Sequence, residues 1–264
     1  MLVATDLDGT LVPKDSSTIP EYTARVLREV DAAGIPVVFI TGRPLRWVEP
    51  LREHVREHGI AIVSNGALTY DLHTDRIERI RGIEPEIGLA VARDIVLALP
   101  TVQLAIEFPD GIRLTPNFEQ EFPMDGAPCG ELDALWDEPA IKLLARDPNV
   151  DHDALRDGVL DAVADRATAT WSMPGLIEIS ARGITKANAL AALCEKRGID
   201  AADVIAFGDM PNDIPMLTWA GTAYAMADAH DSVLAVADHI APSCDDEGVA
   251  QVLEKLLMPS AQRS

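Results

Sequence analysis

The chain has 264 residues, and its 43 Asp and Glu against 22 Lys and Arg give a formal net charge of −21. This charge excludes a protein that binds nucleic acid by neutralising phosphates, and it argues against docking on an anionic membrane. The N-terminus carries no basic and apolar leader, and the three cysteines at positions 129, 194 and 244 are far apart, so we expect a cytoplasmic protein with reduced thiols.

Residues 1–66 alternate short apolar runs with amphipathic stretches. The apolar runs predict buried strands, and the amphipathic stretches predict helices that end at Gly34 and Gly59. In chain order, the expected elements are a strand over Leu2–Thr5, a helix over Pro20–Ala33, a strand over Pro36–Ile40, a helix over Pro44–His58 and a strand over Ile60–Val63. Fully apolar strands that alternate with helices indicate a parallel sheet covered on both faces.

Residues 83–182 follow a different pattern and are strongly acidic. In chain order, we expect a helix over Ile83–Leu99, a hairpin that turns at Pro109-Asp110-Gly111, a strand over Ala140–Arg146, a helix over Asp151–Ala164 and a second hairpin that turns at Pro174-Gly175. This stretch therefore predicts an α+β insert made of two helix-strand-strand units.

The first pattern returns after residue 184. The expected elements are a helix over Thr185–Arg197, a strand over Val204–Phe207, a short helix over Pro211–Trp219, a strand over Thr222–Met226, and helices over 228–236 and Asp246–Leu257, with a frayed tail from Pro259. The predicted fold class is α/β. A Rossmann-like parallel-sheet core would comprise residues 1–82 and 183–264, with an α+β cap inserted over residues 83–182.

Polar segments follow the predicted strands of the core. Two carboxylates come after the first strand, in Asp6-Leu7-Asp8-Gly9-Thr10. Three further segments lie at strand ends or helix starts: Thr41-Gly42, Lys186, and Asp209 with Asn212-Asp213. Because α/β folds bind ligands at the carboxyl ends of parallel strands, we expect these four segments to form one site.

The residue types in this set fit phosphoryl transfer assisted by a metal ion. Oxygen ligands from Asp6, Asp8 and Asp209 suit Mg²⁺. A phosphate dianion among these carboxylates needs compensation, which Mg²⁺, Lys186, the Thr41 hydroxyl and backbone amides would supply. An aspartate could then attack phosphorus and form an acyl phosphate.

The four segments, in this order, resemble the motifs of the haloacid-dehalogenase-like superfamily of phosphohydrolases. The insert, Ser64-Asn65-Gly66-Ala67 and Gly248-Val249-Ala250 are similar to its Cof-like branch, also called class IIB. The resemblance implies that Asp6 is the nucleophile and Asp8 the general acid and base. It also implies roles in phosphate binding and in metal binding, with phosphate held by Thr41, Gly42, Lys186 and Asn212, and Mg²⁺ bound by Asp6, the Asp8 carbonyl and Asp209, with support from Asp213.

The acid at position 8 favours a phosphatase, because hydrolysis of a phosphomonoester needs a group that protonates the leaving alkoxide. We expect a Mg²⁺-dependent phosphatase for small phosphate esters, with sugar phosphates as the first guess and Asn65 and Lys142 as candidate substrate contacts. The alternative for Lys142 is a surface residue. A hexose phosphomutase and a non-catalytic phosphometabolite-binding protein remain alternatives for the chain. A monomer or weak homodimer is expected.

Overall fold

A computed structural model describes residues 1–14, 16, 18–119, 124–171 and 173–257. The chain forms two compact units, which we name the core unit (Met1–Arg79 with Thr185–Ser264) and the insert unit (Ile80–Ile184). Among the described residues, no helix has the length and apolar character needed to cross a membrane. The tail expected to fray from Pro259 lies outside the described residues.

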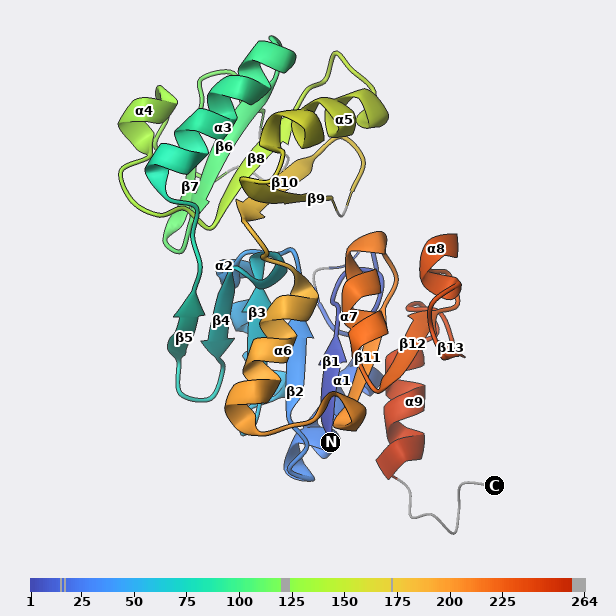
Figure 1. The fold of residues 1–264 in the computed structure, drawn as a ribbon. Helices are drawn as coiled ribbons and strands as arrows, with labels where there is room; N and C mark the ends of the chain where they lie inside the picture. Colours follow the sequence, from blue (N-terminus) through green and yellow to red (C-terminus); the bar gives the residue numbers. More distant parts are fainter. Residues whose placement is uncertain (15, 17, 120–123, 172, 258–264) are drawn as a thin grey trace. The chain divides into compact units, whose positions relative to one another are not determined.

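The core unit is built on an eight-stranded sheet in the order β13-β12-β11-β1-β2-β3-β4-β5 (Figure 1). The strands from β13 to β3 pair in parallel, and β4 pairs antiparallel with β3. The strand bounds are β1 Leu2–Thr5, β2 Val37–Ile40, β3 Ile60–Val63, β4 Leu68–Asp71, β5 Arg76–Ile80, β11 Val204–Gly208, β12 Thr222–Met226 and β13 His239–Ala241. The parallel part confirms the predicted α/β class.

Helices connect the parallel strands of the core unit. They are α1 Glu21–Ala32, α2 Leu45–Val48, α6 Lys186–Arg197, α7 Ile214–Trp219, α8 Asp231–Leu234 and α9 Gly248–Leu257, with 3₁₀ turns η1 Glu49–His54, η2 Ser64–Gly66, η3 Ala201–Asp203 and η4 Pro211–Asp213. Helix α1 packs against α9, and α6 packs against α7. The strands β1, β2 and β3 are buried along their whole length, as their continuous apolar sequences predict.

Several expectations for the core unit were wrong. The helix expected over 228–236 is a single turn, α8. The helix predicted over Pro44–His58 is a single turn, α2, followed by η1, which ends at His54. Pro50 lies in this stretch, and a proline inside a helix removes a backbone donor and clashes with the preceding turn. The strands β4, β5 and β13 were also not expected, because each is short and mixes polar with apolar residues.

The insert unit is a five-stranded sheet, β7-β6-β8-β10-β9, with two helices packed against each other. The bounds are α3 Pro85–Ala98, β6 Gln103–Phe108, β7 Gly111–Leu114, α4 Leu132–Leu135, β8 Lys142–Arg146, α5 His152–Val163, β9 Ala167–Thr170 and β10 Ile177–Ala181. Helices α3 and α5 lie along one face of this sheet (Figure 1). The pairs of strands that follow α3 and α5 are the expected helix-strand-strand units.

Alternation along the strands divides the insert sheet into two unlike faces. One face forms the apolar core with α3 and α5, and it includes Leu104, Ile106, Leu143 and Ile179. The other face carries charged side chains, among them Lys142 on β8, beside a small apolar cluster of Ala105, Ile112 and Leu114. The hairpin predicted at Pro109-Asp110-Gly111 joins β6 and β7.

Candidate active site

Three buried carboxylates meet at the carboxyl ends of β1 and β11. Asp6 directly follows β1 and Asp209 directly follows β11, and these two strands pair in parallel. Asp213 comes from η4, one turn further along. One carboxylate oxygen from each residue lies within 4.8 Å of those of the other two, and the three residues are at most 5% exposed. The sequence placed these residues at strand ends, and the fold brings them into one cluster.

Lys186 neutralises part of this cluster. Its Nζ lies 2.8 Å from Oδ1 of Asp6 and 2.6 Å from Oδ1 of Asp213, and the side chain is buried. Thr185 caps α6 by accepting a hydrogen bond from Asn188 N, which fixes the start of the helix that carries Lys186. Burial alone would lower the pKa of Lys186, but the carboxylates of Asp213 and Asp6 raise it, so the ammonium stays charged.

Asp213 holds the other members of the cluster in place. Its Oδ1 accepts a hydrogen bond from Lys186, and its Oδ2 accepts from the backbone N–H groups of Asp209 and Met210, each at 3.1 Å. A Cβ at Gly208 would lie 2.6 Å from the Asp213 Cβ, so this close approach requires glycine. Both oxygens of Asp213 are therefore occupied by protein donors, which indicates a supporting role.

The turn after β1 approaches Asp209 closely. Gly9 has a φ of +76°, and a Cβ at this position would lie 2.5 Å from Oδ2 of Asp209. The next residue, Thr10, donates its hydroxyl hydrogen to Oδ1 of Asp209 at 3.0 Å. The Gly-Thr pair thus has a local physical reason: the glycine makes room for the carboxylate, and the threonine orients it.

The side chain of Asp8 lies outside this cluster and is paired with Arg43. Arg43 Nε lies 3.0 Å from both Asp8 oxygens, and Nη2 donates to Oδ1 at 2.5 Å. Among the described residues, the carboxylate cluster therefore does not include Asp8, and only its backbone could contribute to a metal site there. No role for Arg43 was expected from the sequence. The sequence signal for this pairing is an arginine two residues after Thr41, because a guanidinium can bind a carboxylate through two donors at once.

Thr41, Asn65 and Asn212 lie close together. Thr41 is fully buried, and its Oγ1 accepts the Arg43 N–H at 3.0 Å, which leaves the hydroxyl hydrogen to donate to a ligand. The Asn65 N–H donates to the Thr41 carbonyl at 2.9 Å, and the amide of Asn212 donates to Oδ1 of Asn65 at 3.4 Å. Gly42 lies in the same loop, between Thr41 and Arg43. Asn65 is itself buried and bonded to both neighbours.

The donor set fits a hard divalent cation. Carboxylate oxygens of Asp6 and Asp209 lie close to each other, and Lys186 balances only part of their negative charge. Burial and the nearby Asp213 carboxylate raise the pKa of Asp209 to about 6, and they raise the pKa of Asp6 as well. Oxygen ligands with unbalanced negative charge are what Mg²⁺ prefers, so Asp6 and Asp209 would hold it, with Asp213 behind them.

The raised pKa of Asp209 predicts how the stability of the metal-free protein changes with pH. Between about pH 4 and pH 6, the folded carboxyl keeps a proton that the unfolded chain has released. The free energy of unfolding should therefore fall as the pH rises through this range. Thermal unfolding in EDTA, followed by circular dichroism, measures it. Asp209→Asn should make the profile flatter, and an equal slope in this variant would assign the effect to other groups.

Lys142 is buried in the insert unit. It is 2% exposed and forms an ion pair with Glu178 on β10, the strand next to β8. The alternative that Lys142 is a surface residue was therefore wrong. Its β6 neighbour in register is Glu107, which is also buried, so this face of the insert sheet presents two acids beside one base. Contact with a substrate stays a prediction.

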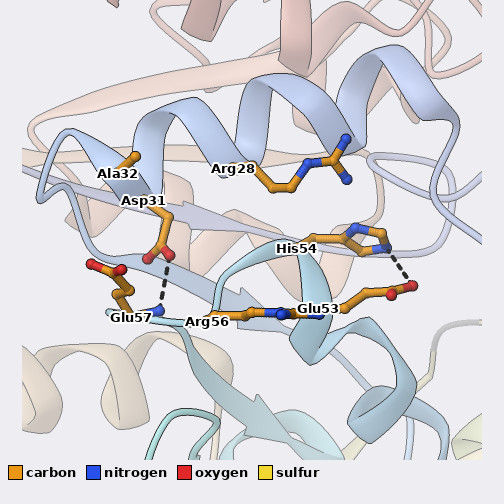
Figure 2. A pocket seen from close by; sticks show the side chains of 7 residues that line it. All are labelled: Arg28, Asp31, Ala32, Glu53, His54, Arg56 and Glu57. Carbon is orange, nitrogen blue, oxygen red and sulfur yellow. Dashed lines mark hydrogen bonds and ion pairs between the residues drawn. The ribbon is translucent and has the colours of Figure 1, made fainter.

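A cavity of about 410 Å³ lies in the core unit between α1 and η1 (Figure 2). It is lined by Arg28, Asp31, Ala32, Glu53, His54, Arg56 and Glu57. The Asp31 carboxylate accepts hydrogen bonds from the backbone N–H groups of Glu57 and His58. It therefore holds the segment that follows η1 against α1. None of the four motif segments lines this cavity, and the charges of its lining are mixed.

Comparison with known proteins decides the family. The model for haloacid dehalogenase-like hydrolases matches residues 3–253. The chain belongs to this family. The resemblance of the four motifs predicted it, and that prediction is confirmed. A 5-amino-6-(5-phospho-D-ribitylamino)uracil phosphatase of Bacillus subtilis is 30% identical over 264 residues, which cover 96% of this chain and 94% of that protein.

Other relatives of this haloacid dehalogenase-like hydrolase are named for different substrates. A phosphoglycolate phosphatase of Methanopyrus kandleri is 28% identical and covers 97% of both chains. The structure of a subclass IIB sugar phosphatase superimposes with a TM-score of 0.82 over 97% of this chain and 98% of that one, at 21% identity. The chain is a phosphatase of the haloacid dehalogenase-like superfamily, with the fold of its subclass IIB.

Proposed function

We propose that the chain is a Mg²⁺-dependent phosphatase that hydrolyses small phosphomonoesters through an aspartyl-phosphate on Asp6. The observation that carries this proposal is the cluster in which Asp6 faces both Lys186 and Asp209. A carboxylate beside a fixed ammonium and a second oxygen ligand has the surroundings that a nucleophile for phosphorus requires. Mg²⁺, when bound by Asp6 and Asp209, would neutralise charge on the phosphoryl oxygens.

The protein's own residues would divide the reaction between them. An Asp6 oxygen attacks phosphorus, and the ester P–O bond breaks as Asp8 gives its proton to the leaving alkoxide. Lys186, Thr41 and Asn212 hold the phosphoryl oxygens by charge and hydrogen bonds. Water then attacks the phosphorus of the aspartyl-phosphate while Asp8 takes its proton. The bond between phosphorus and the Asp6 oxygen breaks, inorganic phosphate leaves, and both Asp6 and the protonated Asp8 are restored.

Arg43 supports the separate role of Asp8. Two donors of its guanidinium bind the Asp8 carboxylate, and the Arg43 side chain is itself mostly buried. This pairing keeps the Asp8 side chain out of the cluster formed by Asp6, Asp209 and Asp213. We assign the acid and base role to Asp8 because the family resemblance implies it, and in that role the Asp8 carboxylate has to leave its ion pair with Arg43.

Sugar phosphates are our first proposal for the substrate class. The relatives named above act on a ribitylamino compound, on phosphoglycolate and on sugars, which share a small polar leaving group. A hexose phosphomutase would need to grip a second phosphate, and the acids Glu107 and Glu178 beside Lys142 disfavour that. A protein that only binds phosphometabolites would not need Asp8. We further propose a cytoplasmic monomer or weak homodimer.

The test is a screen for release of inorganic phosphate with Mg²⁺ present. Sugar phosphates, nucleotides, pyridoxal phosphate and phosphoglycolate are the substrates, and the expected result is turnover of at least one of them. Activity should disappear in excess EDTA and return when Mg²⁺ is added back, because Lys186 balances only part of the negative charge around Asp6. Undiminished turnover in EDTA would contradict the metal assignment, and no release from any ester would favour the binding protein.

A further inference from the structure

We propose that the turn Ser64–Gly66 positions the phosphate-binding groups and that Asn65 acts through Asn212. This inference rests on the proposed function, because it concerns how the same site holds a phosphoryl group. The turn follows β3 and contains none of the groups to which we assign chemistry. It is nevertheless bonded to or packed against the three segments that carry Thr41, Lys186 and Asn212.

The backbone of this turn has a conformation that is rare for these residues. Ser64, Asn65 and Gly66 have φ values of 51°, 55° and 110°, three consecutive left-handed residues. Ser64 and Asn65 are also buried. A non-glycine residue held at positive φ costs free energy, and such a conformation persists only where surrounding contacts enforce it. The contacts that enforce it identify what the turn is for.

Two backbone hydrogen bonds tie the turn to the loop after β2. The Asn65 N–H donates to the carbonyl of Thr41 at 2.9 Å, and the Ser64 N–H donates to the carbonyl of Arg43 at 3.0 Å. The left-handed conformation aims these two consecutive N–H groups at the same loop. The turn therefore fixes the backbone on either side of Gly42, and with it the hydroxyl of Thr41 and the base of the Arg43 side chain.

The side chain of Asn65 reaches the segment after β11. Its Oδ1 accepts a hydrogen bond from Nδ2 of Asn212 at 3.4 Å. An oxygen at this place selects the nitrogen end of the Asn212 amide, because only that end donates. Nδ2 carries a second hydrogen, which is then directed by the first bond. Asn65 thus determines which end of the Asn212 amide is held and leaves one donor for an anion.

Gly66 packs against the start of α6. A Cβ on Gly66 would lie 2.6 Å from the carbonyl oxygen of Thr185 and 2.9 Å from the Cβ of Ala189. These atoms lie on the first turns of the helix whose first residue is Lys186. Only glycine allows this approach, so the turn also sets the distance between the loop of Thr41 and the helix of Lys186.

Asn65→Gly separates the side chain from the backbone. Glycine adopts a φ of 55° without strain and keeps the N–H that bonds Thr41, so the backbone contact stays and the side-chain contact with Asn212 is lost. We expect kcat/KM to fall by about 10- to 100-fold, since misplacing a group by about 1 Å can cost that much. The inhibition constant for inorganic phosphate should rise, while the Mg²⁺ concentration for half-maximal activity and the unfolding temperature stay close to the wild-type values.

Ala164→Gly is the matched control. Ala164 also has a positive φ of 50°, but it is exposed and lies in the insert unit. This variant should show wild-type kinetics, so that relief of backbone strain alone does not explain a change. Asn65→Ser is a second test of the same contact, because it keeps a polar side chain that is too short to reach Asn212. The same loss of phosphate affinity is expected.

The double variant Asn65→Gly with Asn212→Ala tests the connection. If Asn65 acts through Asn212, the double variant should lose no more of kcat/KM than Asn212→Ala alone. Losses that multiply would overturn the inference, and so would wild-type phosphate affinity in Asn65→Gly. No turnover by the wild-type protein on any ester would instead overturn the proposed function, and the inference with it.

Discussion

Asp6→Asn is expected to abolish the release of phosphate from every ester, by a factor on the order of 10⁵ or more. No other carboxylate of the cluster can replace it as the nucleophile, because Asp213 is held by Lys186 and two backbone donors, and Asp209 is held by Thr10. The unfolding temperature should stay the same or rise. Burial and the neighbouring Asp213 carboxylate raise the pKa of Asp6, so its charge is unfavourable in the metal-free fold.

Asp31→Asn is the matched control for this variant. Asp31 is likewise a buried aspartate of the core unit, but it lies on α1 and bonds the backbone of Glu57 and His58. It should lose stability, since an amide accepts one backbone bond where the carboxylate accepts two, and it should keep wild-type kinetics per folded molecule. Steady-state kinetics with intact-mass detection of the phosphoenzyme compare the two. Turnover above the background by a pure Asp6→Asn sample would show that Asp6 is not the nucleophile.

Asp8→Asn is expected to separate the two chemical steps. Nitrophenolate leaves without much protonation, so Asp6 should still be phosphorylated by a nitrophenyl phosphate. The second step lacks the base that activates water, and the aspartyl-phosphate should accumulate. Rapid mixing should show a burst of about one equivalent of nitrophenol, followed by turnover slowed by about 10²–10⁴-fold, the usual contribution of general acid and base catalysis.

A sugar phosphate has a poor leaving group and should give no burst with Asp8→Asn. The contrast between the two substrates is the internal control, because a general loss of folding or of metal affinity would affect both. The phosphoenzyme is detected by intact mass. Near wild-type turnover of both substrates would assign proton transfer to another residue, and the ion pair of Asp8 with Arg43 would then serve only to hold the loop.

The core of the fold could be predicted because its signals are local. Runs such as Val37–Ile40 and Ile60–Val63 are apolar at every position, which only strands buried on both faces require. The strands β4, β5 and β13 were missed because polar or exposed residues interrupt their apolar pattern, and such short stretches resemble loops. The insert was predicted from its turns, since Pro109-Asp110-Gly111 permits few other conformations.

The members of the candidate site could be predicted, but some of their contacts could not. Parallel strands bring their carboxyl ends to one edge, so Asp6 and Asp209 were expected to meet. No pattern along the chain states that the Asp8 side chain turns to Arg43, 35 residues away, because that depends on the path of a loop. Asn65 was predicted as a substrate contact, whereas its described bonds are to Thr41 and Asn212, which lie in two distant segments.

The position of β1 in the sheet has a consequence for synthesis of the chain. β1 lies between β2, which follows it closely, and β11, which begins at Val204. While the ribosome makes the residues between them, β1 has an unpaired edge, and such an edge is a template for pairing with another chain. The strand that covers this edge also delivers Asp209 to Asp6. In the nascent protein, the pairing that covers the edge of β1 is therefore also the pairing that brings Asp209 to Asp6.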